Sequence, residues 1–178
     1  IDIKSFDSTA IINSMVDMSF TSRDTARAAR ILHRMVADPE CTVILTLAGS
    51  TGAAGCLQVY VDMIRSGMVD VVVATGASVV DMDFFEALGF HHYQGTPRAD
   101  DRFLRDLYID RIYDTYIDEE QLQQCDMTIR SIADGLKPGV YSSREFIREM
   151  GRFLSGSEKI KDSLVLAAYE MNVPEIGR

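Results

Sequence analysis

Two apolar runs, each followed by small residues, dominate the hydrophobic pattern of this chain. An amphipathic stretch that ends at Gly67 separates them. In order, the segments are 42–47 (apolar), 49–55 (small), 56–66 (amphipathic), 69–74 (apolar) and 75–78 (small). Strand, loop, helix, strand and loop make a βαβ unit, so both loops should lie at the carboxyl ends of neighbouring parallel strands. Open α/β sheets bind their ligands at this edge.

Helical periodicity surrounds the unit, which predicts an α/β protein with a parallel sheet flanked by helices. The expected helices are 9–16, 21–38, 79–88, 118–134, 142–154 and 157–171. The helix over 21–38 should pack on the sheet through one apolar face, because it leads directly into the first strand. That face consists of Ala28, Ile31, Leu32, Met35 and Val36.

The remaining segments have less regular patterns. Residues 90–97 predict an irregular crossing, and the mixed charged and aromatic residues of 98–117 predict a surface wrap or a subunit contact. Residues 172–174 should begin another strand, but 175–178 lack the apolar character to continue it. The α/β alternation therefore looks incomplete within this chain.

Composition narrows the class of protein. A length of 178 residues suits one domain, and a net charge of −9 without a basic cluster argues against nucleic-acid binding. The three cysteines have no CxxC spacing, which favours reduced thiols in the cytoplasm. We see no signal peptide or membrane-length apolar run, and expect a soluble protein. Cys56 could be a nucleophile at a helix start, but packing under the loop explains it better.

The first small-residue loop could seat a nucleotide. Backbone amides approach an anion freely there, and the following helix adds partial positive charge. Gly52 and Gly55 could supply positive φ angles, and Ser50 and Thr51 supply hydroxyls. The spacing fits neither GxGxxG nor GxxxxGK[ST], so a tight crossover that needs small residues for packing remains an alternative.

Acidic and histidine side chains follow the second loop. Asp81 or Asp83 could hold an ammonium group or a ribose hydroxyl at the rim. Either could equally be a helix-capping acid. His91 and His92 are adjacent and therefore do not share a face, and no third ligand has suitable spacing, so we predict no metal site.

These segments resemble deoxyhypusine synthase and its bacterial and archaeal relatives. The similarity lies in LTLAGSTGAAG, SGMVDVVVATGASVVDMDFFEALGFHHYQGT, DRIYD, YSSREFIREMGRFL and MNVP, and extends in order over residues 20–174. The resemblance implies a Rossmann-like fold, with 1–178 the amino-terminal part of one NAD-binding domain and 1–20 a helical arm. It also implies a cytoplasmic homotetramer with sites between paired subunits.

The activity that the resemblance implies is NAD-dependent transfer of an aminobutyl group from spermidine or a related polyamine. The acceptor is a translation-factor lysine or, in homospermidine-forming relatives, a diamine. Within the family, NAD oxidises the polyamine and an enzyme lysine captures the butyl fragment. The sequence does not distinguish between the acceptors.

Family positions transfer onto this chain one by one. The NAD-contacting loops fall on Gly49, Ser50, Thr51, Gly52 and Ala53, and on Thr75, Gly76 and Ala77. A family pair of glutamates falls on Val80 and Asp81, so one acid is missing unless Asp83 replaces it. The imine-forming lysine follows Trp-Gly in the family, whereas this chain has no tryptophan. A non-catalytic NAD-binding or assembly module is therefore the alternative function.

Overall fold

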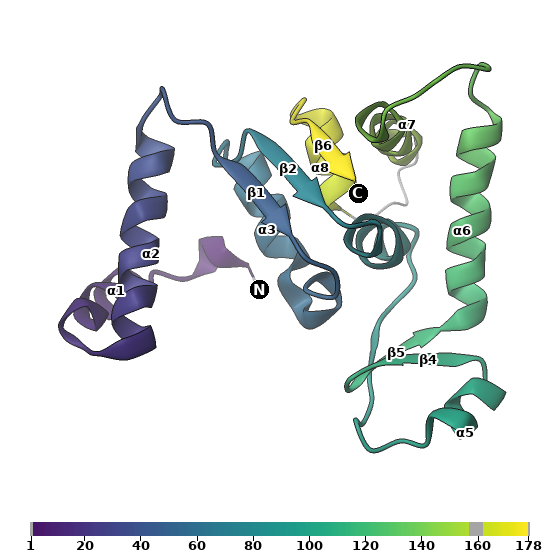
Figure 1. Ribbon diagram of the computed structural model, residues 1–178, viewed down its shortest axis with the longest axis horizontal. Helices are drawn as coiled ribbons and strands as arrows, with labels where there is room; N and C mark the ends of the chain where they lie inside the picture. Colours follow the sequence, from purple (N-terminus) through teal and green to yellow (C-terminus); the bar gives the residue numbers. More distant parts are fainter. Residues whose placement is uncertain (1, 157–161, 178) are drawn as a thin grey trace.

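The computed structural model describes residues 2–156 and 162–177 (Figure 1). Helices η3 and η4 have π-type turns, whereas η1 and η2 are 3₁₀ helices. The elements in chain order are η1 (Ile3–Ser5), α1 (Thr9–Ser14), η2 (Met15–Asp17), α2 (Phe20–Ala37), β1 (Ile44–Leu47), η3 (Gly52–Cys56), α3 (Leu57–Arg65), β2 (Val71–Ala74), η4 (Ala77–Phe84), α4 (Phe85–Ala87), β3 (Tyr93–Gln94), α5 (Asp101–Asp106), β4 (Ile109–Ile112), β5 (Thr115–Asp118), α6 (Glu119–Asp134), α7 (Ser143–Ser155), α8 (Leu164–Glu170) and β6 (Glu175–Gly177).

The predicted βαβ unit forms a parallel sheet in the strand order β1-β2-β6. Leu47 pairs with Ala74 at the carboxyl ends of β1 and β2, so the loops that follow begin side by side. The prediction that residues 175–178 do not form a strand is wrong for 175–177. The amide of Val72 donates to the Pro174 carbonyl (3.0 Å), and Val72 then pairs with Glu175. Strands β2 and β6 pair through backbone groups, whereas the pattern of apolar side chains carries no information on backbone pairing.

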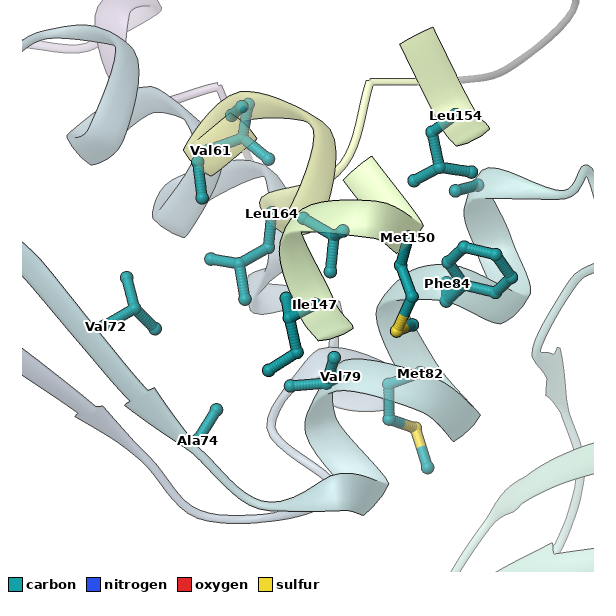
Figure 2. Close-up of a cluster of buried hydrophobic side chains, with 14 of the residues drawn as sticks. Val61, Val72, Ala74, Val79, Met82, Phe84, Ile147, Met150, Leu154 and Leu164 are labelled. Carbon is teal, nitrogen blue, oxygen red and sulfur yellow. The ribbon is translucent and has the colours of Figure 1, made fainter. Parts of the chain in front are cut away.

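One face of the sheet carries the core. Val72 and Ala74 point into a cluster that helices η4, α3, α7 and α8 complete, and Figure 2 shows these side chains converging. Its largest fully buried members include Phe84, Met150 and Leu164. The α/β class is therefore confirmed, with helices η4, α3, α7 and α8 packed on this face.

Helix α2 does not pack on the sheet, which corrects the prediction. It contacts α1 and η2 and stands apart from β1 in Figure 1. Ala26 is its one buried side chain within the described structure, and Ile31 of the predicted apolar face is 48% exposed. Ile44 and Ile176 on the uncovered side of the sheet are also exposed. The amphipathic pattern identified the helix correctly but not the surface against which it packs.

Residues 93–118 include three strands, β3, β4 and β5, of a second, antiparallel sheet that the sequence did not predict. Its strand order is β3-β5-β4, with α5 beside it (lower right of Figure 1). Tyr113 adopts a left-handed backbone conformation (φ 54°) in the turn between β4 and β5. A turn without glycine or Asn-Gly gives no hairpin signal in the sequence, so the pattern missed it.

Within the described residues, the helix boundaries agree well with the capping residues that the sequence predicted. Ser142 and Glu145 form the predicted capping box of α7, and Asp118 caps α6 through the Gln121 amide (3.0 Å). The predicted cap Ser157 lies outside the described residues. The helix that follows begins later than predicted, at Leu164, because Ser163 caps it through the Leu166 amide (3.0 Å). No helix of the described residues combines the length and apolarity that crossing a bilayer requires.

Gly151 lets α7 and α8 approach closely. A Cβ at this position would lie 2.5 Å from Tyr169 Cβ and 3.1 Å from the Val165 carbonyl oxygen. Gly151→Ala should destabilise the protein by about 2–3 kcal/mol, the usual cost of overpacking, measured by urea unfolding. Gly156→Ala is the control, because its Cβ would meet nothing closer than 3.5 Å. Equal stability of the two variants would contradict this account of the contact.

Candidate functional site

The two small-residue loops meet at the carboxyl edge of β1 and β2. The Ser78 hydroxyl donates to the Ala48 carbonyl of the first loop (3.0 Å), and Thr75 Oγ1 lies 3.2 Å from Ser78 Oγ. A Cβ at Gly49 would lie 3.4 Å from Ala77 Cβ. The two loops therefore lie in contact at the carboxyl edge of the sheet, where the sequence predicted them side by side. Ser78, which fastens them together, was absent from the predicted site, although its place in the second loop was visible.

The first loop turns tightly before α3. Ser50 has a left-handed backbone conformation (φ 71°), an unfavourable geometry for a residue with a side chain. Thr51 Oγ1 donates back to the Ala48 carbonyl (3.2 Å), and the Cys56 amide donates to the Thr51 carbonyl (3.2 Å). The latter bond spans five residues, which is the π-helical pattern often found at functional sites. The loop is thus held in one shape by its own hydrogen bonds.

Gly52 and Gly55 have different structural roles. Gly55 has a positive φ of 90°, as predicted. Gly52 does not, and is buried instead, because a Cβ there would come within 2.8 Å of Met82 Cβ on η4. The packing alternative therefore holds for Gly52. Ala53 is half-buried and packs against the core, whereas a Cβ at Gly76 would have open space around it.

The two rim acids have different environments. Asp83 is buried and accepts hydrogen bonds from the Leu164 amide (2.7 Å) and the Val165 amide (2.9 Å), which begin α8. Asp81 is half-buried, and burial together with the Asp126 carboxylate raises its pKa. Asp81 therefore keeps its carboxylate available to a cation, while Asp83 already caps a helix.

Val80 and the two described lysines, Lys4 and Lys137, have structural surroundings. Val80 packs against the core, and its carbonyl accepts a hydrogen bond from the Cys125 thiol (3.7 Å). Lys4 forms an ion pair with the buried Asp62. Lys137 lies beyond α6 next to the Tyr141 hydroxyl, which donates to its carbonyl. The other two lysines of the chain, Lys159 and Lys161, lie outside the described residues.

Comparisons with known proteins agree with this geometry. The parallel sheet with joined small-residue loops at its carboxyl edge defines an α/β protein of the kind that binds ligands at strand ends. The family model for deoxyhypusine synthase matches residues 10–176. The chain therefore belongs to the deoxyhypusine synthase family.

Relatives that match nearly the whole chain are themselves about twice as long. Proteins named deoxyhypusine synthase-like are 62% identical in Coxiella burnetii (98% of this chain, 50% of the relative) and 61% identical in Caulobacter vibrioides (98% and 48%). A Methanosarcina acetivorans protein named "Probable deoxyhypusine synthase 2" is 34% identical (98% and 50%). The chain thus spans about half the length of these curated relatives.

A solved structure supports the fold. The crystal structure of a candidate deoxyhypusine synthase from Entamoeba histolytica superposes with a TM-score of 0.66 at 15% identity, covering 98% of this chain and 59% of that one. At this identity the likeness concerns the fold alone. Membership of the family rests on the sequence comparisons.

Proposed function

We propose that the protein carrying this chain transfers an aminobutyl group from spermidine or a related polyamine to an acceptor amine, with NAD as cofactor. The observation that carries the proposal is the pair of loops fastened by the Ser78–Ala48 hydrogen bond, in a chain of the deoxyhypusine synthase family. The chain would contribute the amino-terminal half of the site, and the imine-forming lysine would come from the remaining half of the protein. A cytoplasmic tetramer with sites between subunits belongs to the same proposal.

The residues present suit a dinucleotide. In this proposal the first loop would hold one side of NAD through Gly49, Ser50, Thr51, Gly52 and Ala53, and the second loop the other side through Thr75, Gly76 and Ala77. The open space beside the Gly76 backbone, where no heavy atom lies within 4 Å of a Cβ position, supports this fit. NAD would supply the oxidising power, while the chain's own groups bind and orient it.

Asp81 is the better candidate of the two acids for the polyamine. Its carboxylate could pair with a protonated nitrogen, and the nearby Asp126 strengthens the negative potential there. Asp83 remains an alternative contact, although its oxygens already accept two backbone amides. The acceptor amine, either a translation-factor lysine or a diamine, is left open.

A large side chain in the first loop tests the cofactor assignment. Ser50→Trp in the full-length protein should weaken NAD binding at least tenfold, about 1.4 kcal/mol, because the indole would fill the crevice. Calorimetric titration with NAD measures this, and Arg130→Trp on the exposed face of α6 is the control. An unchanged NAD affinity in Ser50→Trp would contradict the assignment of NAD to the first loop.

The non-catalytic module remains the second candidate function, and Val80 favours it because an acid expected from the family is replaced by a core side chain. The full-length protein should be incubated with NAD and spermidine, with putrescine or the translation factor as acceptor, and products identified by mass. A product four carbons and one amine heavier than the acceptor supports the transferase. NAD binding without any product supports the module.

A further inference from the structure

A pocket between α1 and α2 lies outside the two small-residue loops and their rim acids. It measures about 500 Å³. Its lining residues are Ser8, Thr9, Ile12 and Asn13 from α1 and the residue before it, and Ala29, Arg30, His33 and Arg34 from α2. Figure 1 shows the two helices side by side at the amino-terminal end of the chain, apart from the parallel sheet. None of the family positions carried onto this chain lines this pocket.

The two arginines of this pocket have no counter-ion. Arg30 and Arg34 are exposed, and among the described residues neither side chain forms a hydrogen bond or an ion pair. Acidic residues are in excess in this chain, whose net charge is −9, and Arg65 and Arg111 each pair with a carboxylate. No described carboxylate, however, lines this pocket. Because residues four apart on a helix are neighbours, the Arg30 and Arg34 guanidinium groups repel each other, and an anion between them would remove that repulsion.

The other polar side chains of the pocket supply further hydrogen-bond donors. The hydroxyl of Ser8 makes no capping hydrogen bond to α1. The side chains of Asn13 and His33 have no hydrogen-bond partner within the part of the chain that the structure describes. Asp7, the acid that precedes the pocket residues, accepts hydrogen bonds from the Thr9 amide (2.9 Å) and the Thr9 hydroxyl. The pocket therefore brings together donors that no described group of the chain uses.

The charge and the donors of the pocket favour one kind of anion. A guanidinium group is planar and presents its N–H donors as a fork that binds two oxygens of one anion at once. Two such forks, with a hydroxyl and an amide beside them, suit the three terminal oxygens of a phosphate monoester better than the two oxygens of a carboxylate. The charge of a phosphate monoester, close to −2, also matches the two arginines. Ile12 and Ala29 are half-buried and give the pocket an apolar side.

We propose that the pocket between α1 and α2 binds an organic phosphate monoester. Arg30 and Arg34 would hold the phosphate oxygens, and the Ser8 hydroxyl would donate to the same group. The organic part would lie along Ile12 and Ala29, which distinguishes an organic phosphate from free phosphate. Neither small-residue loop lines the pocket, so the inference goes beyond the proposed function and depends on neither NAD nor group transfer.

Calorimetric titration of the full-length protein with phenyl phosphate, at constant ionic strength and without NAD, tests the proposal. Binding should saturate and should be tighter than that of inorganic phosphate, and acetate should not bind. Arg30→Gln and Arg34→Gln should each weaken binding at least tenfold. Arg27→Gln is the matched control, because it removes the same charge from the preceding turn of α2 but Arg27 does not line the pocket. All three side chains are exposed, so the variants should fold normally, and salt screens the distant charge in the control.

Spectra of ¹⁵N-arginine-labelled protein identify the contact. Phenyl phosphate should shift the Nε–H signals of Arg30 and Arg34, which the two variants assign, and leave in place the signal of Arg111, whose Nε already donates to Asp101 (2.7 Å). Unchanged Nε–H signals, absence of saturable binding, or binding of inorganic phosphate alone would overturn the proposal. An equal loss of affinity in Arg27→Gln would also overturn it and would indicate a row of arginines that attracts anions only through its net charge.

Two further titrations separate this pocket from the proposed cofactor site. Saturating NAD should leave the affinity for phenyl phosphate unchanged, and displacement of phenyl phosphate by NAD would overturn the proposal, because the phosphate would then occupy the cofactor site. Ser50→Trp should also bind phenyl phosphate normally. Loss of NAD binding would therefore affect the proposed transferase without changing the result for the pocket between α1 and α2.

Discussion

Glu175→Gln is expected to remove a steep loss of stability between about pH 5 and pH 8. Glu175 begins β6, is 3% exposed, and neither of its carboxylate oxygens has a hydrogen-bond partner among the described residues. Burial, and secondarily the charge of Asp83, raises the pKa of Glu175 from its ordinary value of 4.5 to about 8. At neutral pH the folded protein therefore keeps this carboxyl protonated.

The direction of the effect follows from proton binding. Between pH 4.5 and 8 the folded state binds the Glu175 proton and the unfolded state releases it, so the free energy of unfolding falls as pH rises. Each unit of pKa difference corresponds to about 1.4 kcal/mol, which makes the total on the order of 5 kcal/mol. Burial also raises the pKa of Asp83, to about 6, and this group adds a smaller loss of the same sign.

Urea unfolding at pH 5, 6, 7 and 8, followed by far-UV circular dichroism, measures the effect, because the chain has no tryptophan to report by fluorescence. Wild-type protein should lose stability steadily over this range. Glu175→Gln should have a much flatter profile, with the residual slope belonging to the other carboxyl groups of raised pKa, Asp83 and Asp110. Glu120→Gln, on an exposed part of α6, should follow the wild-type profile. Parallel profiles for wild type and Glu175→Gln would show that Glu175 is not the titrating group.

The sequence predicted the parallel sheet, both loops and most helix ends, because these features depend on local patterns. The two apolar runs specify strands, and capping residues such as Ser142 and Asp118 begin helices through hydrogen bonds to amides a few residues away. The two loops were also predicted from a local pattern, since small residues between a strand and a helix rarely form anything other than a tight loop. The resemblance then assigned NAD to them, which stays a prediction.

Contacts between distant segments explain what the pattern missed. Helix α2 has an apolar face, but amphipathicity does not say which surface covers it. The hairpin of β4 and β5 depends on a left-handed Tyr113, an uncommon choice that propensities disfavour. The pairing of Glu86 with His92 spans six residues through an irregular segment, so the sequence analysis, which considered His92 only as a metal ligand, did not predict it. The role of Ser78 was missed for the same reason, because its hydrogen-bond acceptor, the Ala48 carbonyl, lies thirty residues earlier in the chain.

Asp83 is another residue whose contacts with a distant segment the sequence did not predict. Its substitution is the second change for which we expect a large effect. The sequence allowed a substrate acid or a cap for its own helix, whereas the structure shows it capping α8, eighty residues away. Asp83→Ala would leave the buried Leu164 and Val165 amides without these acceptors. Each unsatisfied buried donor costs about 1–3 kcal/mol, so we expect a loss of about 3–4 kcal/mol in the free energy of unfolding.

Ser163→Ala is the comparison variant, because Ser163 caps the same helix through the Leu166 amide (3.0 Å), although its side chain also hydrogen-bonds the Asp83 carboxylate. Loss of such a cap costs about 1 kcal/mol, so Asp83→Ala should be clearly the more damaging variant in the same urea assay. Asp83→Asn should fall between the two, since its amide can still accept from one backbone donor. Removing the Asp83 charge should also move the titration of Glu175 to lower pH, because that charge helps to raise the pKa of Glu175. If Asp83→Ala were as stable as Ser163→Ala, α8 would not depend on this carboxylate, and Asp83 would regain the role of an ammonium ligand that the sequence also allowed.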